Sequence, residues 1–460
     1  MPIFRTQANV DRNAVREQYE AYPYPERDPE AEKERLLSTW PEQLAQINHY
    51  CFRGRRDFRG GFRVLIAGGG TGDATIYLAE QLRDTDAQLV YLDWSGASLA
   101  IAQRRAQIRK LANIRFVHGS LLELPALGLG RFDYISCTGV LHHLDDPEKG
   151  LESLLSVLDP EGALNILVYG RYGRAAVYQL QDLMKIINGD GADMRQKVER
   201  AKAVLASLPP TNAWIRHRLN RDPGSMQEAE IYDLFLHAQD RAYTVPELHA
   251  WFGTRAGLHL QFSRLNIGRI GYQPQGYIRA PALLEIVSRL PPAEQAAVAE
   301  LVAGDMDLHS FFATRSADAA ASLEELDNVP FFYGGFELNR GPELAAWMEK
   351  NPGRVAELKD ARSGLVGWVV PGKYTRELLR QLDGERSLRE VFGGARASEP
   401  ALAGVSDAEL LNDFRAVYEV FNAVDGMLLR HRSVPKFPTT AELTQLAYRW
   451  QQLPQDMPRT

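Results

Sequence analysis

The sequence predicts an α/β protein built on a doubly wound, mostly parallel seven-stranded sheet. The first observation is an alternation over residues 63–315, where short β-branched or aromatic runs alternate with segments of helical periodicity. This alternation is typical of parallel strands joined by right-handed crossovers, with helices on both faces. The second observation is a glycine-rich turn after the first run, in FRVLIAGGGTGD (62–73). It lies at the carboxyl end of a strand, where open parallel sheets bind ligands.

Seven runs are expected to form the strands. They are RVLIAG (63–68), QLVYLD (88–93), IRFVHG (114–119), FDYISC (132–137), ALNILVYG (163–170), LHLQFSRL (258–265) and LHSFFATR (308–315). Helices are expected between them, among others over 75–83, 96–110 and 291–304. Residues 171–252 show helical periodicity with breaks at 208–212 and 221–225, which predicts a helical insertion after the fifth strand.

Three units are expected along the chain, because 460 residues are too many for one core of ordinary size. Residues 1–58 form an N-terminal helical and aromatic lid segment, and residues 59–318 form the sheet domain with its insertion. Residues 319–460 form a C-terminal accessory domain, in which helices over 375–392 and 407–426 precede a short β segment. That order resembles a small α+β winged-helix module, which suits either peptide recognition or formation of a homodimer.

Composition narrows the classes of partner. A net charge of −6 gives no general attraction for a polyanion, so nucleic acid is not expected as a partner. No run approaches the roughly 18 apolar residues that span a bilayer, and no signal peptide is recognised, so a cytoplasmic protein without membrane association is expected. The two cysteines cannot form a disulfide framework. The ten histidines form no H-x-x-x-H or H-E-x-x-H motif, so no metal site is expected.

The glycine turn indicates a ligand without a phosphate at that place. Gly68, Gly70 and Gly72 give G-x-G-x-G, whereas a dinucleotide site has G-x-G-x-x-G with a helix N-terminus aimed at the pyrophosphate. Asp73 would repel a phosphate, and no Lys-Ser or Lys-Thr closes a P-loop. Asp93, at the end of the second strand, can accept hydrogen bonds from a ribose diol or can cap the following helix.

These residues resemble the class I S-adenosylmethionine-dependent methyltransferases over about residues 60–170. Four blocks carry the resemblance in order: LIAGGGTGD, VYLDWS, FVHGSLLELP and FDYISCTGVLHHLDDPEKGLESLLSVLDPEGAL. The resemblance implies a Rossmann-like fold, S-adenosylmethionine as the cofactor and methyl transfer as the reaction. It assigns cofactor contacts to Gly68, Gly70, Gly72, Asp93, Trp94, Ser120, Leu121, Thr138 and Gly139. Asp93 would hold the ribose hydroxyls, Trp94 would pack on adenine, and Thr138 and Gly139 would lie near the methionine amino group.

Two positions depart from that family. The acid that usually stands two residues before the first glycine is Ile66 here, and the Asp that usually follows the third strand is Ser120. The first change removes a carboxylate that helps to organise the methionine end. The second weakens recognition of the adenine amino group. We expect another group to compensate, or the affinity to be lower.

Candidate catalytic residues follow the fourth strand and precede the sheet. A general base is needed only if the acceptor is protonated, and His142 and His143 are candidates, with His142 preferred because it is nearer the strand end. They can equally cap the next helix. The stretch VREQYEAYPYPERDP (15–29) resembles QYE..PYP stretches of bacterial methyltransferase-like proteins. Its Tyr19 and Tyr24 are expected to form an aromatic lid over the cofactor, attracted to its positive sulfur, or to pack on the sheet domain.

Acceptor contacts are expected after the fifth strand and in the insertion, from Tyr169, Arg171, Tyr178, His237 and Arg241. Such a polar cluster could recognise an acceptor that carries a carboxylate, or it could anchor a loop through ion pairs. Three functions stay open: methylation of a small molecule held between the sheet and the insertion, methylation of a protein or peptide held by the C-terminal domain, and binding of S-adenosylmethionine or S-adenosylhomocysteine without catalysis.

Overall fold

The computed structural model describes most of the chain. The described residues are 12–189, 191–217, 225–265, 267–334, 340–352, 354–359, 365–438 and 442. Outside them lie residues 1–11 of the predicted lid segment, 190, 218–224 and 266 of the predicted sheet domain with its insertion, and 335–339, 353, 360–364, 439–441 and 443–460 of the predicted C-terminal domain.

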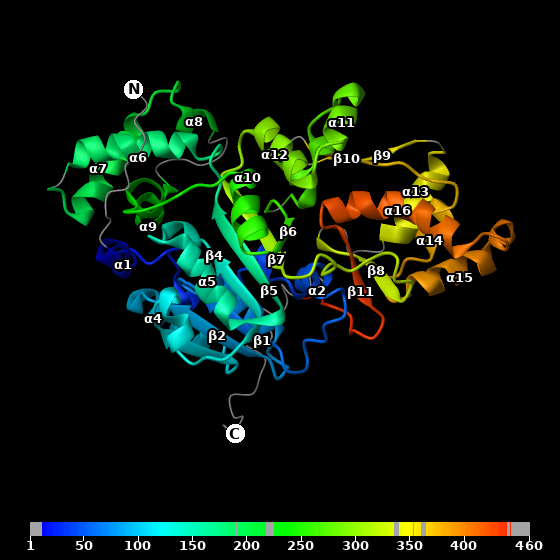
Figure 1. Cartoon of the computed structure of the whole chain (residues 1–460), viewed down its shortest axis with the longest axis horizontal. Coiled ribbons are helices and arrows are strands. Elements are labelled where there is room, and N and C mark those ends of the chain that lie inside the picture. The colour runs from blue at the N-terminus through cyan, green and yellow to red at the C-terminus, as the bar shows by residue number, and fades with distance from the viewer. Residues whose placement is uncertain are drawn as a thin grey trace.

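The predicted seven-stranded sheet is confirmed. Its strands are β1 (Arg63–Ala67), β2 (Gln88–Asp93), β3 (Ile114–His118), β4 (Phe132–Thr138), β5 (Leu158–Tyr169), β6 (His259–Phe262) and β7 (Leu308–Thr314). They lie in the order β3-β2-β1-β4-β5-β7-β6. Figure 1 shows the sheet with helices around it. The first five strands run parallel, and β7 runs antiparallel to both β5 and β6. The strand order reverses at β1, so ligands are expected above β1 and β4.

Two apolar clusters cover the faces of this sheet. Leu65 and Ile135 belong to a cluster that includes α5 (Pro147–Val157), α10 (Val245–Leu248) and α12 (Pro292–Ala303). The opposite face packs on α2 (Leu44–Cys51) and α3 (Asp73–Gln81). Burial on both faces explains why the inner strands read as nearly continuous apolar runs. A further helix beside the sheet is α4 (Gly96–Ile108), which contacts β2 and β3, whereas α11 (Pro281–Ser288) packs on α12.

The segment after β5 is helical, as expected, and has a core of its own. Its helices are α6 (Ala175–Asn188), α7 (Met194–Ser207), α8 (Ala213–His217) and α9 (Glu228–Ile231), followed by the π-helical turn η6 (Tyr232–Leu236). Leu180, Met184 and Phe235 are buried in this small core. The chain returns to the sheet at α10, which begins after the capping box of Thr244 and Glu247.

The C-terminal part packs around buried Phe392 and Phe414. Its elements are β8 (Asn328–Phe332), α13 (Arg340–Lys350), β9 (Ala356–Lys359), β10 (Val366–Val369), α14 (Thr375–Arg380), α15 (Leu388–Ser398), α16 (Asp407–Ala423) and β11 (Met427–His431). The single helix expected over 375–392 is wrong, because Gly384 adopts a φ of 76° and Ser387 caps a new helix. The strand expected after the helices is present and pairs with β8. The winged-helix resemblance stays a prediction.

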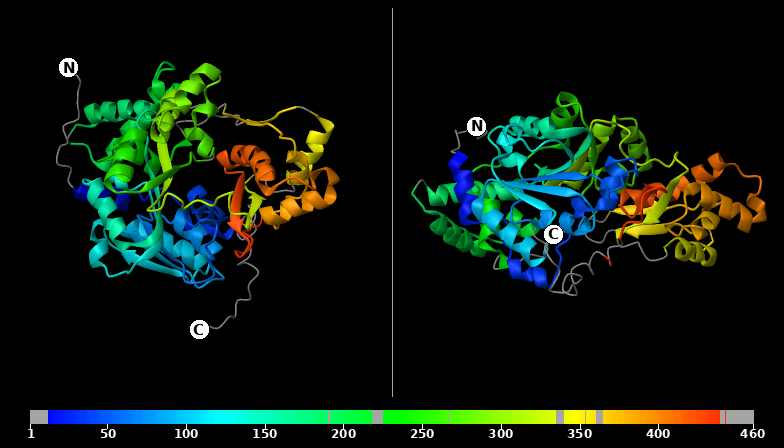
Figure 2. Two further views of the ribbon diagram at one scale, coloured as in Figure 1. Left: turned by 45° about the vertical axis from the view of Figure 1, so that its right-hand side comes forward. Right: turned by 90° about the horizontal axis from the view of Figure 1, so that it is seen from below.

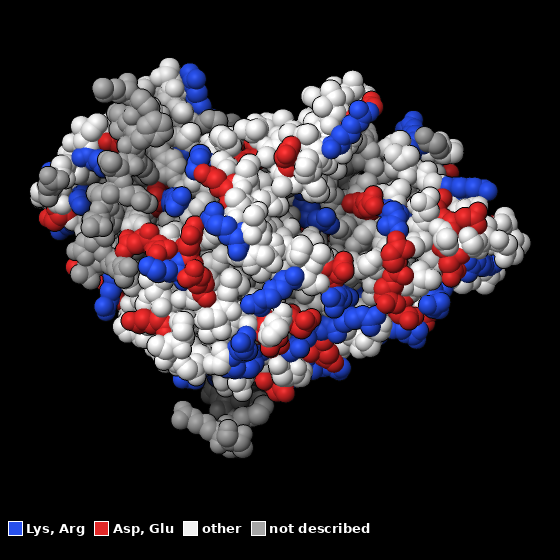
Figure 3. Space-filling view, in the orientation of Figure 1, with Lys and Arg blue, Asp and Glu red and all other residues white. Residues whose placement is uncertain are grey.

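The insertion and the C-terminal helices lie at opposite ends of the molecule, with the sheet between them (Figure 2). The junction with the C-terminal part is polar and buried: the N–H of Leu429 in β11 donates to Nδ1 of His49 in α2 at 3.0 Å. Burial lowers the pKa of His49 to about 3, so this histidine is neutral. Acidic and basic side chains are interspersed over the face that Figure 3 shows. No helix in the described part of the chain has the length and apolar character needed to cross a bilayer.

Candidate functional site

A cavity of about 550 Å³ lies at the carboxyl ends of the parallel strands. Its volume is in the range of small-molecule sites, roughly 300–1,000 Å³. Of the predicted cofactor contacts, those that line it are Gly68, Gly70, Asp93, Trp94, Ser120, Leu121, Thr138, Gly139 and Tyr19. Gly72 is not part of the lining. Of the other predicted site residues, Tyr24, His143 and Tyr169 line the cavity.

The glycine turn brings its backbone close to other parts of the protein. Gly68 and Gly70 have φ values of 74° and 51°, which residues with a side chain rarely adopt. A Cβ atom on Gly68 would lie 2.3 Å from Val140, and one on Gly70 would lie 2.9 Å from the carbonyl oxygen of Tyr24. The turn therefore has to be glycine-rich so that the lid segment and the loop after β4 can close over the cavity.

Asp93 ends β2 with its carboxylate at the cavity. It accepts hydrogen bonds from the backbone N–H of Gly70, at 2.8 Å, and of Ser95, at 2.9 Å. Burial raises the pKa of Asp93, and these N–H donors oppose the rise. Because the carboxylate occupies the N–H of Gly70, that amide is not available to a phosphate. The remaining acceptor positions of the carboxylate suit two hydroxyl donors, as a ribose diol supplies.

The argument that Asp73 repels a phosphate needs correction. Asp73 forms ion pairs with Arg27, at 2.7 Å, and with buried Arg105, at 2.6 Å. Burial alone would raise the pKa of Asp73, but the hydrogen bonds and charges of the two arginines lower it overall. The Asp73 charge is thus neutralised locally. The exclusion of a phosphate rests instead on the occupied amide of Gly70.

The N-terminal segment, predicted to be a lid, contributes Val15 and Tyr19 of α1 (Arg12–Ala21) and the following Tyr24 to the cavity wall. It is fixed to the loops after β1 and β2. The contacts are Ser95 Oγ to the carbonyl of Tyr19 (3.1 Å), the N–H groups of Gly96 and Ala97 to the carboxylate of Glu20 (2.7 and 3.0 Å), and Thr71 Oγ1 to the carbonyl of Pro25 (2.7 Å). The lid thus binds the same loops that hold the predicted cofactor contacts.

The two histidines after β4 differ in their surroundings. His142 is fully buried outside the cavity wall, with its ring centroid 4.1 Å from that of His143 and 3.8 Å from that of Tyr169. Neither ring nitrogen of His142 has a hydrogen-bond partner. His143 lines the cavity and donates from Nδ1 to the carbonyl of Gln239 at 2.8 Å. The preference for His142 as the residue that reaches an acceptor is therefore reversed in favour of His143.

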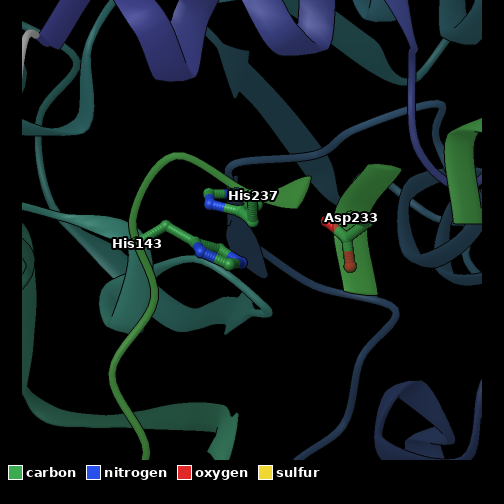
Figure 4. Close-up of side chains that lie close together, drawn as sticks. All are labelled: His143, Asp233 and His237. Atoms are coloured by element: carbon green, nitrogen blue, oxygen red, sulfur yellow. The ribbon is translucent and has the colours of Figure 1, made fainter. Parts of the chain in front are cut away.

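A hydrogen-bonded network surrounds His143 at one end of the cavity. The hydroxyls of Tyr19 and Tyr169 donate to the two carboxylate oxygens of Asp233, at 3.1 and 3.0 Å. His237 Nε2 lies 3.1 Å from the Tyr19 hydroxyl, and the ring of His237 stacks on that of His143 at 3.8 Å. Figure 4 shows His143, which follows β4, beside Asp233 of η6 and His237, the residue that ends this turn. Asp233 was not predicted from the sequence, although it is the one acid in the otherwise apolar run YDLFL.

This cluster bears on the expectation that there is no metal site. Ligand atoms of His143, Asp233 and His237 lie within 4.8 Å of one another, a spacing that a metal ion could bridge. The backbone N–H of Gln239, however, donates to His237 Nδ1 at 3.0 Å. In a neutral imidazole the proton is then on Nε2, which donates to Tyr19 and has no lone pair for a metal. The observed contacts therefore fit a proton-ordered network better than a metal centre.

Four predicted acceptor contacts, His237 of the network above and three others, are not part of the cavity wall. Arg171 forms an ion pair with Glu247 at 2.7 Å, and the Arg241 guanidinium lies 5.3 Å from the centre of the Tyr243 ring. Tyr178 packs beside Arg174. Arg174, which was not predicted, is buried, pairs with Asp240 at 2.9 Å and lies over the ring of Tyr169. The ion pairs of Arg171 and Arg174 lie within the segment after β5, as the alternative interpretation, a loop anchored by ion pairs, expects. No Lys or Arg of the described ranges lines the cavity.

Comparisons with known proteins agree with this geometry. Residues 65–164 match the family model of a methyltransferase domain. An uncharacterized protein of Synechococcus sp. is 35% identical over 253 residues, which cover 54% of this chain and 60% of that protein. The ubiquinone/menaquinone biosynthesis C-methyltransferase UbiE of Idiomarina loihiensis is 31% identical over 125 residues, covering 27% of this chain and 49% of that enzyme. The match thus spans less than two thirds of either relative.

A solved structure shares the fold over most of the chain. PKMT2 from Rickettsia typhi, in complex with AdoHcy, superimposes with a TM-score of 0.55 at 15% identity, covering 85% of this chain and 76% of that one. At this identity the likeness describes the fold alone. Together with the methyltransferase-domain match over residues 65–164, it confirms the predicted resemblance of the sheet domain to the class I S-adenosylmethionine-dependent methyltransferases.

Proposed function

We propose that this protein transfers a methyl group from S-adenosylmethionine to a small acceptor held between the sheet, the lid and the helical insertion. The observation that carries the proposal is a single cavity that contains both Asp93 and His143. A nucleoside-binding carboxylate and a neutral imidazole thus face the same enclosed space. This arrangement is what transfer between a bound nucleoside and a bound acceptor requires.

The residues around Gly68 and Asp93 fit the cofactor. Asp93 offers acceptor positions for the ribose hydroxyls, and Trp94 and Leu121 offer apolar surface for the adenine ring. Gly68 and Gly139 leave space for the amino-acid part because they carry no side chain. When it is bound there, S-adenosylmethionine supplies an electrophilic methyl carbon on a positively charged sulfur.

His143 is placed to accept a proton from the acceptor. Its Nδ1–H is held by the carbonyl of Gln239, which leaves the Nε2 lone pair as the base. Burial lowers the pKa of His143, partly opposed by the charge of Asp233, so the ring is neutral at pH 7. An acceptor O–H or N–H beside Nε2 can give up its proton as its lone pair attacks the methyl carbon. Tyr19 and Tyr24 position the acceptor from the lid side.

The charge of the cavity wall indicates the class of acceptor. Its charged residues are the acids Glu42, Asp73, Asp93, Asp145 and Asp233, of which Asp73 is neutralised by arginines. No Lys or Arg of the described ranges lines the cavity to bind a carboxylate. We therefore infer an uncharged or cationic acceptor. Arg171 and Arg241 lie outside the cavity wall and do not offer a site for an acceptor carboxylate.

The alternatives make distinct demands on the same cavity. A peptide acceptor held by the C-terminal domain would bring residues of that domain to the cavity, but the lining residues that are described all precede residue 309. A binder without catalysis would have the acceptor end filled by protein, whereas here the space continues from Asp93 to His143. Both features favour the small acceptor.

The test is release of S-adenosylhomocysteine by the full-length protein. Purified protein is incubated with S-adenosylmethionine and separate pools of amines, alcohols and phenols, carboxylic acids, and peptides. We expect turnover with a neutral or amine pool. Turnover with peptides alone would replace the proposal by peptide methylation. Tight binding of the cofactor in calorimetry without turnover in any pool would favour the non-catalytic binder.

A further inference from the structure

We propose that Glu42 binds the α-ammonium group of S-adenosylmethionine, and so supplies from the N-terminal segment the carboxylate that β1 lacks at Ile66. The inference rests on the proposed function, because it takes S-adenosylmethionine as the ligand. Glu42 ends η2 (Trp40–Glu42), a short 3-10 helix far in sequence from the glycine turn. It was not among the residues predicted from the sequence.

Glu42 contacts a row of neighbouring residues on β1, β4 and β5 to which Ile66 belongs. In the sheet register Ile66 of β1 is opposite Ser136 of β4, and Ser136 is opposite Asn165 of β5. One carboxylate oxygen of Glu42 accepts from Ser136 Oγ at 2.8 Å and from Asn165 Nδ2 at 3.1 Å. The carboxylate of Glu42 therefore lies beside the position at which a side chain acid on β1 would act.

The same row lies directly below the cofactor end of the cavity. Side chains two residues apart on a strand share a face, so Gly68 and Thr138 stand above Ile66 and Ser136. Glu42, Ile66, Gly68 and Thr138 all line the cavity. A ligand whose amino-acid part lies on Gly68 and Thr138 thus has the Glu42 carboxylate beneath that part and not beneath the nucleoside, which Asp93 binds.

The backbone of Glu42 is held in place from two sides. Gln81 of α3 donates from Nε2 to the carbonyl of Glu42 at 2.8 Å, and the Tyr134 hydroxyl donates to the carbonyl of the preceding Pro41 at 3.1 Å. The residue is 1% exposed. A carboxylate fixed in this way loses little conformational entropy when a ligand binds, which is a property of a preorganised site.

The carboxylate of Glu42 has hydrogen bonds but no cation. Burial raises its pKa, and the groups that oppose this rise are neutral donors, chiefly the hydroxyl of Ser136. Within the described ranges, no Lys or Arg lines the cavity to pair with it. Buried charges are normally paired, so a cation is the missing partner. The α-ammonium group of the cofactor supplies that charge together with N–H donors.

Three related ligands separate this role from others. S-Adenosylmethionine has the ammonium and the positive sulfur, and S-adenosylhomocysteine has the ammonium with a neutral sulfur. 5′-Deoxy-5′-methylthioadenosine has the nucleoside and a neutral sulfur but no amino-acid part. Their dissociation constants are measured by calorimetry with the full-length protein and with Glu42→Gln, which keeps the size and an acceptor oxygen.

We expect Glu42→Gln to weaken both amino-acid-bearing ligands by at least about tenfold, as is typical for loss of a hydrogen bond to a charged group. The affinity for methylthioadenosine should not change. A second variant, Ser136→Ala, removes one donor to the carboxylate and should weaken the same two ligands by a smaller factor. It too should spare methylthioadenosine.

Other outcomes overturn the inference in recognisable ways. An equal loss of affinity for all three ligands would show that Glu42 is a structural residue. A weaker affinity for S-adenosylmethionine with an unchanged affinity for S-adenosylhomocysteine would place Glu42 at the positive sulfur instead of the ammonium. Unchanged affinity for all three would remove Glu42 from the site. Failure of the unmodified protein to bind any of them would instead contradict the proposed function itself.

Discussion

The two ends of the cavity are built in different ways. The end with Gly68 and Asp93 consists of loops that directly follow β1, β2, β3 and β4, and each loop lies next to its strand in the sequence. The end with His143 combines residues from α1, from the loop after β4, from β5 and from the insertion. The first end is a series of local turns, and the second exists only once distant segments have packed together.

This difference explains which end of the cavity can change in sequence and shape while the fold of the sheet stays the same. The strand-end loops are proposed to bind the cofactor, and their glycines also pass close to the lid and to Val140. The network around Asp233 is attached to the insertion, which has its own apolar core. The acceptor end can therefore change with the insertion while the sheet stays the same. Three substitutions test whether the two ends are functionally separate.

The largest effect is expected from His143→Gln, which removes the base at the acceptor end. Turnover should fall by about 10²–10⁴-fold, the usual contribution of general base catalysis, while the affinity for the cofactor stays unchanged. Release of S-adenosylhomocysteine and calorimetry measure the two quantities. A parallel loss of cofactor affinity would show that the two ends are not separate.

The neighbouring histidine is the control. His142→Phe keeps an aromatic ring between His143 and Tyr169 and removes two buried ring nitrogens that have no partner. Turnover should persist, and the free energy of unfolding should not decrease, because unpaired buried polar atoms are costly. A turnover as low as that of His143→Gln would restore His142 as the catalytic candidate.

The pH dependence of turnover provides a further check on His143. Burial lowers its pKa, so the base is free at neutral pH and becomes protonated only as the pH falls below its usual range near 6.5. The rate should therefore be level around pH 7 and decrease on the acid side. A rate that increases as the pH falls through this range would contradict a basic role.

An intermediate effect is expected from Asp93→Ala at the cofactor end. Loss of hydrogen bonds to a buried carboxylate should weaken cofactor binding by about 1–3 kcal/mol. Asp86→Ala is the matched control, since Asp86 also accepts a backbone N–H, that of Gly61, but lies before the opposite end of β2. Calorimetry that finds equal affinities for the two variants would remove Asp93 from the ribose contact.

The smallest effect is expected from Tyr19→Phe, which connects the lid to the insertion. Its hydroxyl contacts both Asp233 and His237. Because Asp233 keeps the hydrogen bond from Tyr169, the loss of this hydroxyl should cost only about 0.5–1.5 kcal/mol in stability. Tyr22→Phe is the control, because the Tyr22 ring stacks on Tyr232 and its hydroxyl is outside the network. Denaturant unfolding compares the two. Equal stability of both variants would mean that the network does not hold the lid.

The sequence predicted most of the sheet and most of the cofactor end. β2 was predicted with the bounds that it has, and the other strands were predicted within a few residues, except for the start of β5. Alternating patterns of apolar residues are local, and so is the glycine turn beside Asp93. The class I methyltransferase resemblance followed from the same local blocks and is confirmed.

The parts that sequence reasoning missed depend on contacts between distant segments. Asp233 meets Tyr19 across more than two hundred positions of the chain, and Glu42 reaches Ser136 across more than ninety. No local pattern marks such pairs. The choice between His142 and His143 depended on which ring turns toward the cavity, and the break between α14 and α15 depended on the left-handed conformation of Gly384.

The hydrogen bonds that fix the lid have a kinetic consequence. The Glu20 carboxylate accepts the first N–H groups of α4, and the Pro25 carbonyl accepts the hydroxyl of Thr71, so the lid is attached to the two loops that are proposed to contact the nucleoside. Any movement that frees the nucleoside also strains these attachments, and a bound nucleoside that steadies the loops also steadies the lid. The residence time of the ligand and the protection of α1 from hydrogen exchange are therefore coupled. A ligand that dissociates more slowly should be accompanied by slower amide exchange in α1.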